Sequence, residues 1–145
     1  MADPSDTTMH RELRAALNDI HSMLLDIHKA LLDHERRRYE AANGAVEPGA
    51  VLQLIMSHPW FAWLKPLSSL ILQIDELTEG NEPIDLNAGR ALLTQARQTV
   101  APREDATPFQ REYLRVIQEY PETASLHGQW KQLLQSPIVQ RATAV

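Results

Sequence analysis

The stretch that decides the fold is LRAALNDIHSMLLDIHKALL, residues 13–32. Its apolar positions recur at alternating steps of four and three residues, the heptad spacing that places them on one side of an α-helix. The positions of this heptad seam are Leu13, Leu17, Ile20, Leu24, Ile27 and Leu31. Further apolar residues widen the seam on both sides, so the pattern predicts a long helix that faces several neighbours in a helical bundle.

We expect this helix to begin near residue 9, capped by Ser5, Asp6 or Thr7, and to end at Asn43-Gly44, a favourable C-terminal cap. Its length of about 35 residues corresponds to ~50 Å at 1.5 Å per residue. No other expected helix is much over half as long. We therefore expect a second copy of the chain to cover part of the seam, most simply in a twofold dimer.

Prolines, glycines and capping residues divide the rest of the chain into shorter helices. Pro59 and Pro66 either break the second helical region or bend it. No segment has the two-residue period of a strand. The expected shorter helices cover residues 48–58, 66–79, 86–100, 108–120 and 122–135, with Asp85 as one N-cap and Thr107–Gln110 as a capping box. The sequence thus predicts an all-α helical bundle with one long N-terminal helix and four or five shorter helices.

The expected organisation is a single helical-bundle domain, residues 9–135, between a flexible N-terminus, 1–8, and a flexible tail, 136–145. Composition narrows the functions available to it. The chain has no cysteine, so it forms neither disulfides nor thiolate metal sites. Its net charge of −5 disfavours general nucleic-acid binding, and no apolar run approaches the ~18 residues of a membrane span. We predict a cytoplasmic protein whose partners are neither nucleic acid nor membrane.

Six histidines raise the question of a metal site. A helix offers two ligands to one ion when they are three or four residues apart, but the chain has no Glu-x-x-His and no His-x-x-x-His. His21 and His28 are seven residues apart, about 10 Å along a helix. We expect them to flank the seam and to bond a backbone or carboxylate partner. With no nucleophile or phosphate-loop motif either, we predict no catalytic residue, no metal, no cofactor and no enzymatic activity.

The segment HPWFAWLKP, residues 58–66, is the densest group of aromatic side chains. We interpret it as a packing corner, the place where two helices meet and close one end of the bundle. On a helical turn, Trp60, Trp63 and Leu64 would share one side, with Phe61 or Trp63 nearer the surface. The alternative is an exposed aromatic patch for a subunit, another protein or an apolar ligand, because aromatics are favoured at interface centres.

Arg38 lies in HERRRYE, residues 34–40, the only basic cluster of the chain, and it occupies a heptad position. One interpretation is a solvated helix end, in which the cations complement the helix dipole. A second is a buried or interface ion pair between Arg38 and Glu35, Asp75 or Glu76. A third is contact with an acidic partner. Arg38 is therefore a candidate binding residue.

Three segments together resemble a group of small bacterial all-helical proteins that share an HPWFAWLKPLS-like segment. The segments are IHKALLDHERRRYE (27–40), HPWFAWLKPLSSLILQIDE (58–76) and RVIQEYPETASLHG (115–128). The likeness covers most of residues 20–130. It implies a bacterial helical protein and carries over no activity and no catalytic residue.

Taken together, the sequence predicts a non-enzymatic helical bundle that acts by protein–protein interaction, as a homodimer or on another protein. The alternative is a bundle with an internal pocket for an apolar ligand or cofactor. The candidate residues for such a pocket are Trp60, Phe61, Trp63, Met23, Met56 and either His21 or His28.

Overall fold

A computed structural model describes the backbone of residues 4–143 and the side chains of residues 7–143. This part of the chain consists of helices and contains no strand. The elements are α1 (Pro4–Asn43), α2 (Pro48–Ser57), the 3-10 helix η1 (Pro59–Leu64), α3 (Lys65–Thr78), α4 (Leu86–Thr99), α5 (Pro108–Glu119), α6 (Pro121–Gln135) and α7 (Pro137–Thr143). The predicted all-α bundle with one long N-terminal helix is confirmed.

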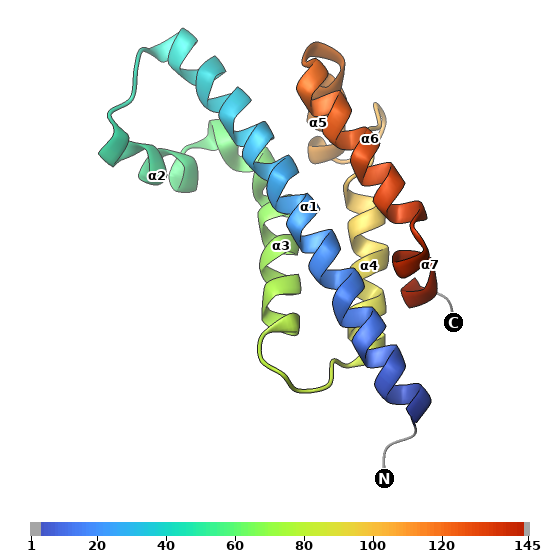
Figure 1. Cartoon of the computed structure of the whole chain (residues 1–145). Coiled ribbons are helices and arrows are strands. Elements are labelled where there is room, and N and C mark those ends of the chain that lie inside the picture. The colour runs from blue at the N-terminus through green and yellow to red at the C-terminus, as the bar shows by residue number, and fades with distance from the viewer. Residues whose placement is uncertain (1–3, 144–145) are drawn as a thin grey trace.

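Helix α1 runs the length of the molecule, and α3, α4, α6 and α7 pack along it (Figure 1). Helix α5 packs on α6, and η1 joins the upper ends of α1, α3 and α5. Helix α2 differs from the others, because it packs chiefly against η1 and projects to one side at the upper end (Figure 1). This leaves α2 as an outlying arm of the bundle.

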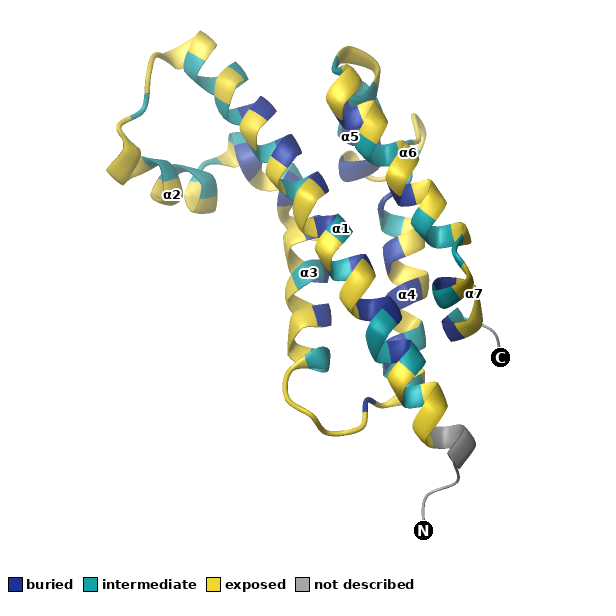
Figure 2. Cartoon of the chain, in the orientation of Figure 1, coloured by how far each residue is buried: buried dark blue, intermediate teal, exposed yellow. Residues whose placement is uncertain are grey.

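The heptad seam forms the centre of the core. All six of its positions are at most 2% exposed, and α3, α4, α6 and α7 of the same chain cover them. Figure 2 shows the corresponding buried residues along α1. The expectation that a second chain covers part of the seam is therefore wrong, because several shorter helices of the same chain, arranged around α1, cover it.

The ends of most helices follow their predicted signals. Gly44, with φ of 93°, directly follows α1. The Asp85 side chain caps α4 by accepting a hydrogen bond of 3.0 Å from the backbone N–H of Ala88. Both bonds of the Thr107–Gln110 capping box are present at the start of α5. Helix α2 ends at Ser57, and His58 separates it from η1, which begins at Pro59. At the other proline there is no break, because η1 continues directly into α3, in which Pro66 is the second residue.

The N-terminus of α1 lies earlier than expected. The helix begins at Pro4, so Ser5, Asp6 and Thr7 lie within it rather than cap it, and residues 4–8 of the predicted flexible segment are helical. Residues 1–3 lie outside the described residues.

The predicted flexible tail is a further correction, because Pro137–Thr143 form α7. Val139 and Ala142 are 1% and 5% exposed, and α7 packs on α1. Arg141 Nε lies 3.3 Å from Glu12 Oε1, an ion pair that joins the two helices. Seven residues are too few for a stable isolated helix, so this docking supplies the order. Residues 144 and 145 lie outside the described part.

Candidate interaction surface

The aromatic segment is a packing corner, with a side-chain arrangement set by its 3-10 geometry. A 3-10 helix has three residues per turn, so residues three apart share a side. Phe61 and Leu64 share the inner side at 2% and 3% exposed, while Trp60 and Trp63 share the other side and are half-buried. The predicted grouping of Leu64 with Trp60 is wrong because it assumed α-helical periodicity. Of the two residues considered for the side nearer the surface, Trp63 lies there and Phe61 does not.

Trp60 and Trp63 join η1 to two of its neighbours, α1 and α5. The ring centroid of Trp60 lies 5.5 Å from that of Tyr39 on α1, and the Arg38 guanidinium carbon lies 5.5 Å from the same Trp60 centroid. The Trp63 ring lies 5.7 Å from Phe109 on α5. Both indole Nε1 atoms are buried without a hydrogen-bond partner on the protein. The two tryptophans therefore act mainly as packing surfaces between α1, η1 and α5.

Of the interpretations considered for Arg38, the ion pair is present, and its partner is Glu35. Its Nη1 lies 2.9 Å from Glu35 Oε1, and Arg115 Nη2 on α5 lies 2.8 Å from the same oxygen. Glu35 is only 2% exposed, so this carboxylate links two helices in the interior. Arg115 also binds Glu112 and Glu119 at 2.8 and 3.1 Å. The guanidinium of Arg38 is thus engaged within the chain, which favours the structural interpretation of this residue.

His21 and His28 both contact α3. His28 Nε2 lies 3.0 Å from the Ser68 hydroxyl, and His21 Nε2 lies 3.8 Å from Asp75 Oδ1. The carboxylate partner of His21 was expected, whereas the hydroxyl partner of His28 was not. Burial lowers the pKa of His28 from its usual 6.5, so its ring is neutral at physiological pH. The two histidines thus contact α3 at positions seven residues apart.

Two leucines lie on the surface between these polar contacts. His21, Leu25 and His28 follow steps of four and three on α1, and Ser68, Leu72 and Asp75 do the same on α3. Residues at such steps share a face, so Leu25 and Leu72 lie on one side of the helix pair. They are 45% and 56% exposed.

A small pocket extends this apolar area to α2. Its volume is about 220 Å³, and its walls come from α1, α2, η1 and α3. The lining residues are His28, Leu32, Ile55, Met56, Phe61, Leu64, Lys65 and Ser68. Of the residues predicted for an internal pocket, Met56, Phe61 and His28 contribute, whereas Trp60, Trp63, Met23 and His21 do not.

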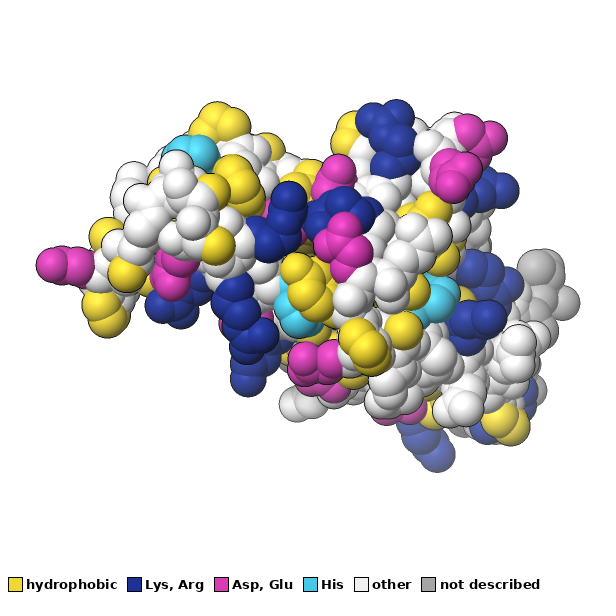
Figure 3. All heavy atoms as spheres, turned by 90° about the horizontal axis from the view of Figure 1, so that it is seen from above, with side chains coloured by type: hydrophobic (Ala, Val, Ile, Leu, Met, Phe, Trp, Pro, Cys, Tyr) yellow, Lys and Arg dark blue, Asp and Glu magenta, His cyan; other side chains and the backbone are white. Residues whose placement is uncertain are grey.

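Helix α2 has an unusual composition for its position. It carries no charged residue, yet none of its residues is buried, and Leu52 and Met56 are each 68% exposed. These two lie four residues apart on one side of α2. Figure 2 shows only intermediate and exposed residues on α2, and Figure 3 shows hydrophobic side chains at the surface of the lobe that contains it.

These features form one area, which we call the α1–α2–α3 surface. It consists of Leu25, Leu72, Leu52 and Met56 together with the 220 Å³ pocket between them. The described residues contain five exposed large hydrophobic side chains, and four of them belong to this surface. The fifth, Met9, lies near the other end of α1. Sequence reasoning missed Leu52 and Leu72 as surface residues, although Leu72 falls outside the core stripe of α3.

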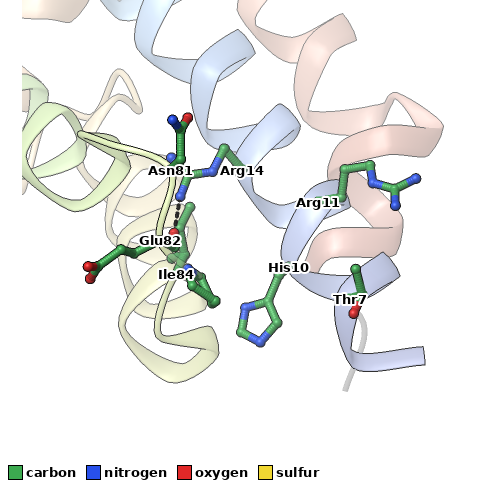
Figure 4. Close-up of a pocket in the computed structure, with 8 residues that line it drawn as sticks. Thr7, His10, Arg11, Arg14, Asn81, Glu82 and Ile84 are labelled. Carbon is green, nitrogen blue, oxygen red and sulfur yellow. Dashed lines mark hydrogen bonds between the residues drawn. The ribbon is translucent and has the colours of Figure 1, made fainter. Parts of the chain in front are cut away.

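A second hollow, of about 380 Å³, lies between the start of α1 and the α3–α4 loop (Figure 4). Arg14 reaches across to the loop and donates hydrogen bonds to the carbonyl oxygens of Thr78, Gly80 and Glu82. Figure 4 shows His10 directed toward the loop and Arg11 directed away from it. Arg14 thereby binds carbonyls at and beyond the C-terminal end of α3, a structural role, and none of the predicted site residues lines this hollow.

Within the described residues, no three histidine, aspartate or glutamate side chains lie close enough to hold one metal ion. In the same part of the chain, none of the helices combines the length and apolar character needed to cross a lipid bilayer. No family model, curated protein or solved structure matches the chain.

Proposed function

We propose that this protein acts by protein–protein interaction through the α1–α2–α3 surface, and that its partner is a second copy of the same chain. The observation that carries the proposal is the gathering of four of the five exposed large hydrophobic side chains on this one surface. Scattered apolar residues are normal on a monomer, whereas a contiguous group with a polar rim is typical of an interface.

The residues around this surface fit an interface rim. Lys29, Lys65 and Asp75 are exposed and border the leucines and the pocket. Helix α2 offers apolar side chains without a charge to desolvate, which favours burial against a partner. The absence of cysteine from the sequence fits a reducing compartment, so we also propose a cytoplasmic location.

Sedimentation velocity at micromolar concentrations tests this function. We expect wild-type protein to sediment at twice the chain mass of 16.4 kDa and the Leu72→Asp variant to sediment as a monomer, because a charge at the centre would have to be desolvated. Met9→Asp is the matched control, since it places the same charge on an exposed hydrophobic position away from the surface. Circular dichroism verifies that all three fold. A wild-type mass of one chain, or a Leu72→Asp dimer, would contradict the proposal.

The pocket supports a second candidate, the binding of a small apolar ligand. Its 220 Å³ is lined by Phe61, Met56 and Leu64, with His28, Ser68 and Lys65 as polar groups. Ligand pockets commonly occupy ~300–1,000 Å³, so only a small molecule would fit. Native mass spectrometry of protein from its own host tests this candidate. An additional mass that disappears on denaturation supports it, and masses at whole multiples of the chain favour self-association.

A further inference from the structure

We propose that two copies associate with their α3 helices antiparallel, so that Lys65 of each copy meets Glu76 of the other. This pairing rests on the proposed function and specifies its geometry. The argument begins with the outer side of α3. Lys65, Ser69, Leu72 and Glu76 follow steps of four, three and four residues, so they form one line along the helix. All four are exposed.

Charge is distributed unevenly along this line. Lys65 lies at the end next to α2, beside the pocket, while Asp75 and Glu76 lie at the opposite end of α3. On α1, Lys29 follows Leu25 toward the α2 end, and His21 faces Asp75 at the other end. Neither Lys65 nor Glu76 forms an ion pair with another described residue. The line on α3 is therefore cationic at the end next to α2 and acidic at its far end.

Twofold symmetry restricts how such a surface meets itself. An isologous contact uses the same patch on both subunits, either with the two lines running in the same direction or in opposite directions. Parallel lines place lysine on lysine and carboxylate on carboxylate, which costs free energy. Antiparallel lines place each cationic end on an acidic end. The charge distribution therefore selects the antiparallel arrangement.

The spacing of the residues fits this arrangement. Lys65 and Glu76 are separated by eleven positions, about 16 Å along the axis. A twofold axis between Ser69 and Leu72 places the midpoint of this interval at the centre and creates two equivalent Lys65–Glu76 pairs. The leucines then lie beside the axis. Because α2 lies beyond the cationic end, each α2 extends toward the acidic end of the other copy, where Leu52 and Met56 become covered.

Reversing the charge at Lys65 and Glu76, first separately and then together, tests the pairing. We expect Lys65→Glu and Glu76→Lys each to weaken the dimer roughly tenfold or more, because each change removes two symmetry-related pairs and creates like-charge contacts. The double variant Lys65→Glu/Glu76→Lys should recover wild-type affinity to within about threefold, since the pairs reform with reversed direction. Lys131→Glu is the matched control, because it changes the net charge equally from an exposed position on α6.

The absence of cysteine from the sequence allows a second, geometric readout. A mixture of Lys65→Cys and Glu76→Cys chains should give a disulfide-linked dimer on mild oxidation in far greater yield than either variant alone. Glu76→Cys mixed with Lys131→Cys is the control and should show no such gain.

The outcomes separate the two proposals. A wild-type monomer, or a dimer indifferent to Leu72→Asp, overturns the use of this surface and the pairing with it. A dimer that depends on Leu72 overturns the antiparallel pairing alone if Lys65→Glu has no larger effect than Lys131→Glu, if the double variant does not recover, or if the mixed cysteine chains do not crosslink.

Discussion

Replacing Trp130 by phenylalanine measures what one buried hydrogen bond contributes to this fold. The Trp130 side chain is fully buried, and its indole N–H donates to the Val100 carbonyl oxygen at 3.1 Å. Trp130→Phe keeps an aromatic ring and removes the donor. Leaving the buried Val100 carbonyl without a donor lowers the free energy of unfolding by about 1–3 kcal/mol. The smaller ring lowers it by roughly 1 kcal/mol more through lost packing. We expect the free energy of unfolding to fall by about 2–4 kcal/mol in total.

Trp63→Phe provides the matched control, because the Trp63 indole N–H is buried but has no hydrogen-bond partner on the protein. The same chemical change there removes ring atoms and an unpaired donor, so we expect a loss of about 1 kcal/mol or less. Urea unfolding followed by far-ultraviolet circular dichroism gives both values, with unchanged slopes required for the comparison. Equal losses at the two positions would refute the assignment of the difference to the Trp130–Val100 hydrogen bond.

Four further predictions concern stability. Glu35→Ala leaves two guanidinium groups without their shared buried carboxylate, so we expect urea unfolding to show a loss of about 1–3 kcal/mol; no loss would mean that the pairs add nothing. Val139→Asp places a charge under α7 and should cost about 2 kcal/mol or more by the same assay, whereas a flexible tail would show no change. Burial lowers the pKa of His28 from 6.5. Below about pH 6.5 the unfolded chain therefore binds more protons than the folded chain, and the free energy of unfolding falls with acidification. Urea unfolding measured from pH 8 to pH 5 should show a smaller fall in this free energy for His28→Gln than for the wild type. Gly44 has φ of 93°, so Gly44→Ala should lower the melting temperature, while Gly128→Ala, in an exposed position within α6 with open space around it, should raise it.

The fold was largely predictable because the sequence contains clear helix start and stop signals. Glycine and capping residues mark the C-terminal end of α1 and the starts of α4 and α5, and the heptad spacing identifies the inner side of α1. What the spacing does not specify is which helices cover that side. A seam that matches a coiled coil is equally well covered by several short helices from the same chain, and here α3, α4, α6 and α7 cover it.

The failures have specific physical causes. The buried residues of helix α7 are Val139 and Ala142. Two apolar positions are too weak a local pattern to predict a helix, because its order depends on packing against α1. At the packing corner, residues 59–64, the predicted grouping of Leu64 with Trp60 is wrong because the period is three residues rather than 3.6. The candidate surface was missed for a different reason. Apolar composition predicts burial, and α2 is the helix whose apolar residues the chain leaves uncovered.

The position of α7 against α1 has a consequence for synthesis of the protein. The first helix leaves the ribosome first, but its coverage is completed by Val139 and Ala142, more than a hundred residues later. At about 5–20 residues per second, a nascent chain waits roughly 5–20 s between the two events. Throughout that interval the leucine-rich side of α1 is partly exposed to other nascent chains and to chaperones. Synthesis of α7 therefore sets the earliest moment at which this side of α1 can be fully covered.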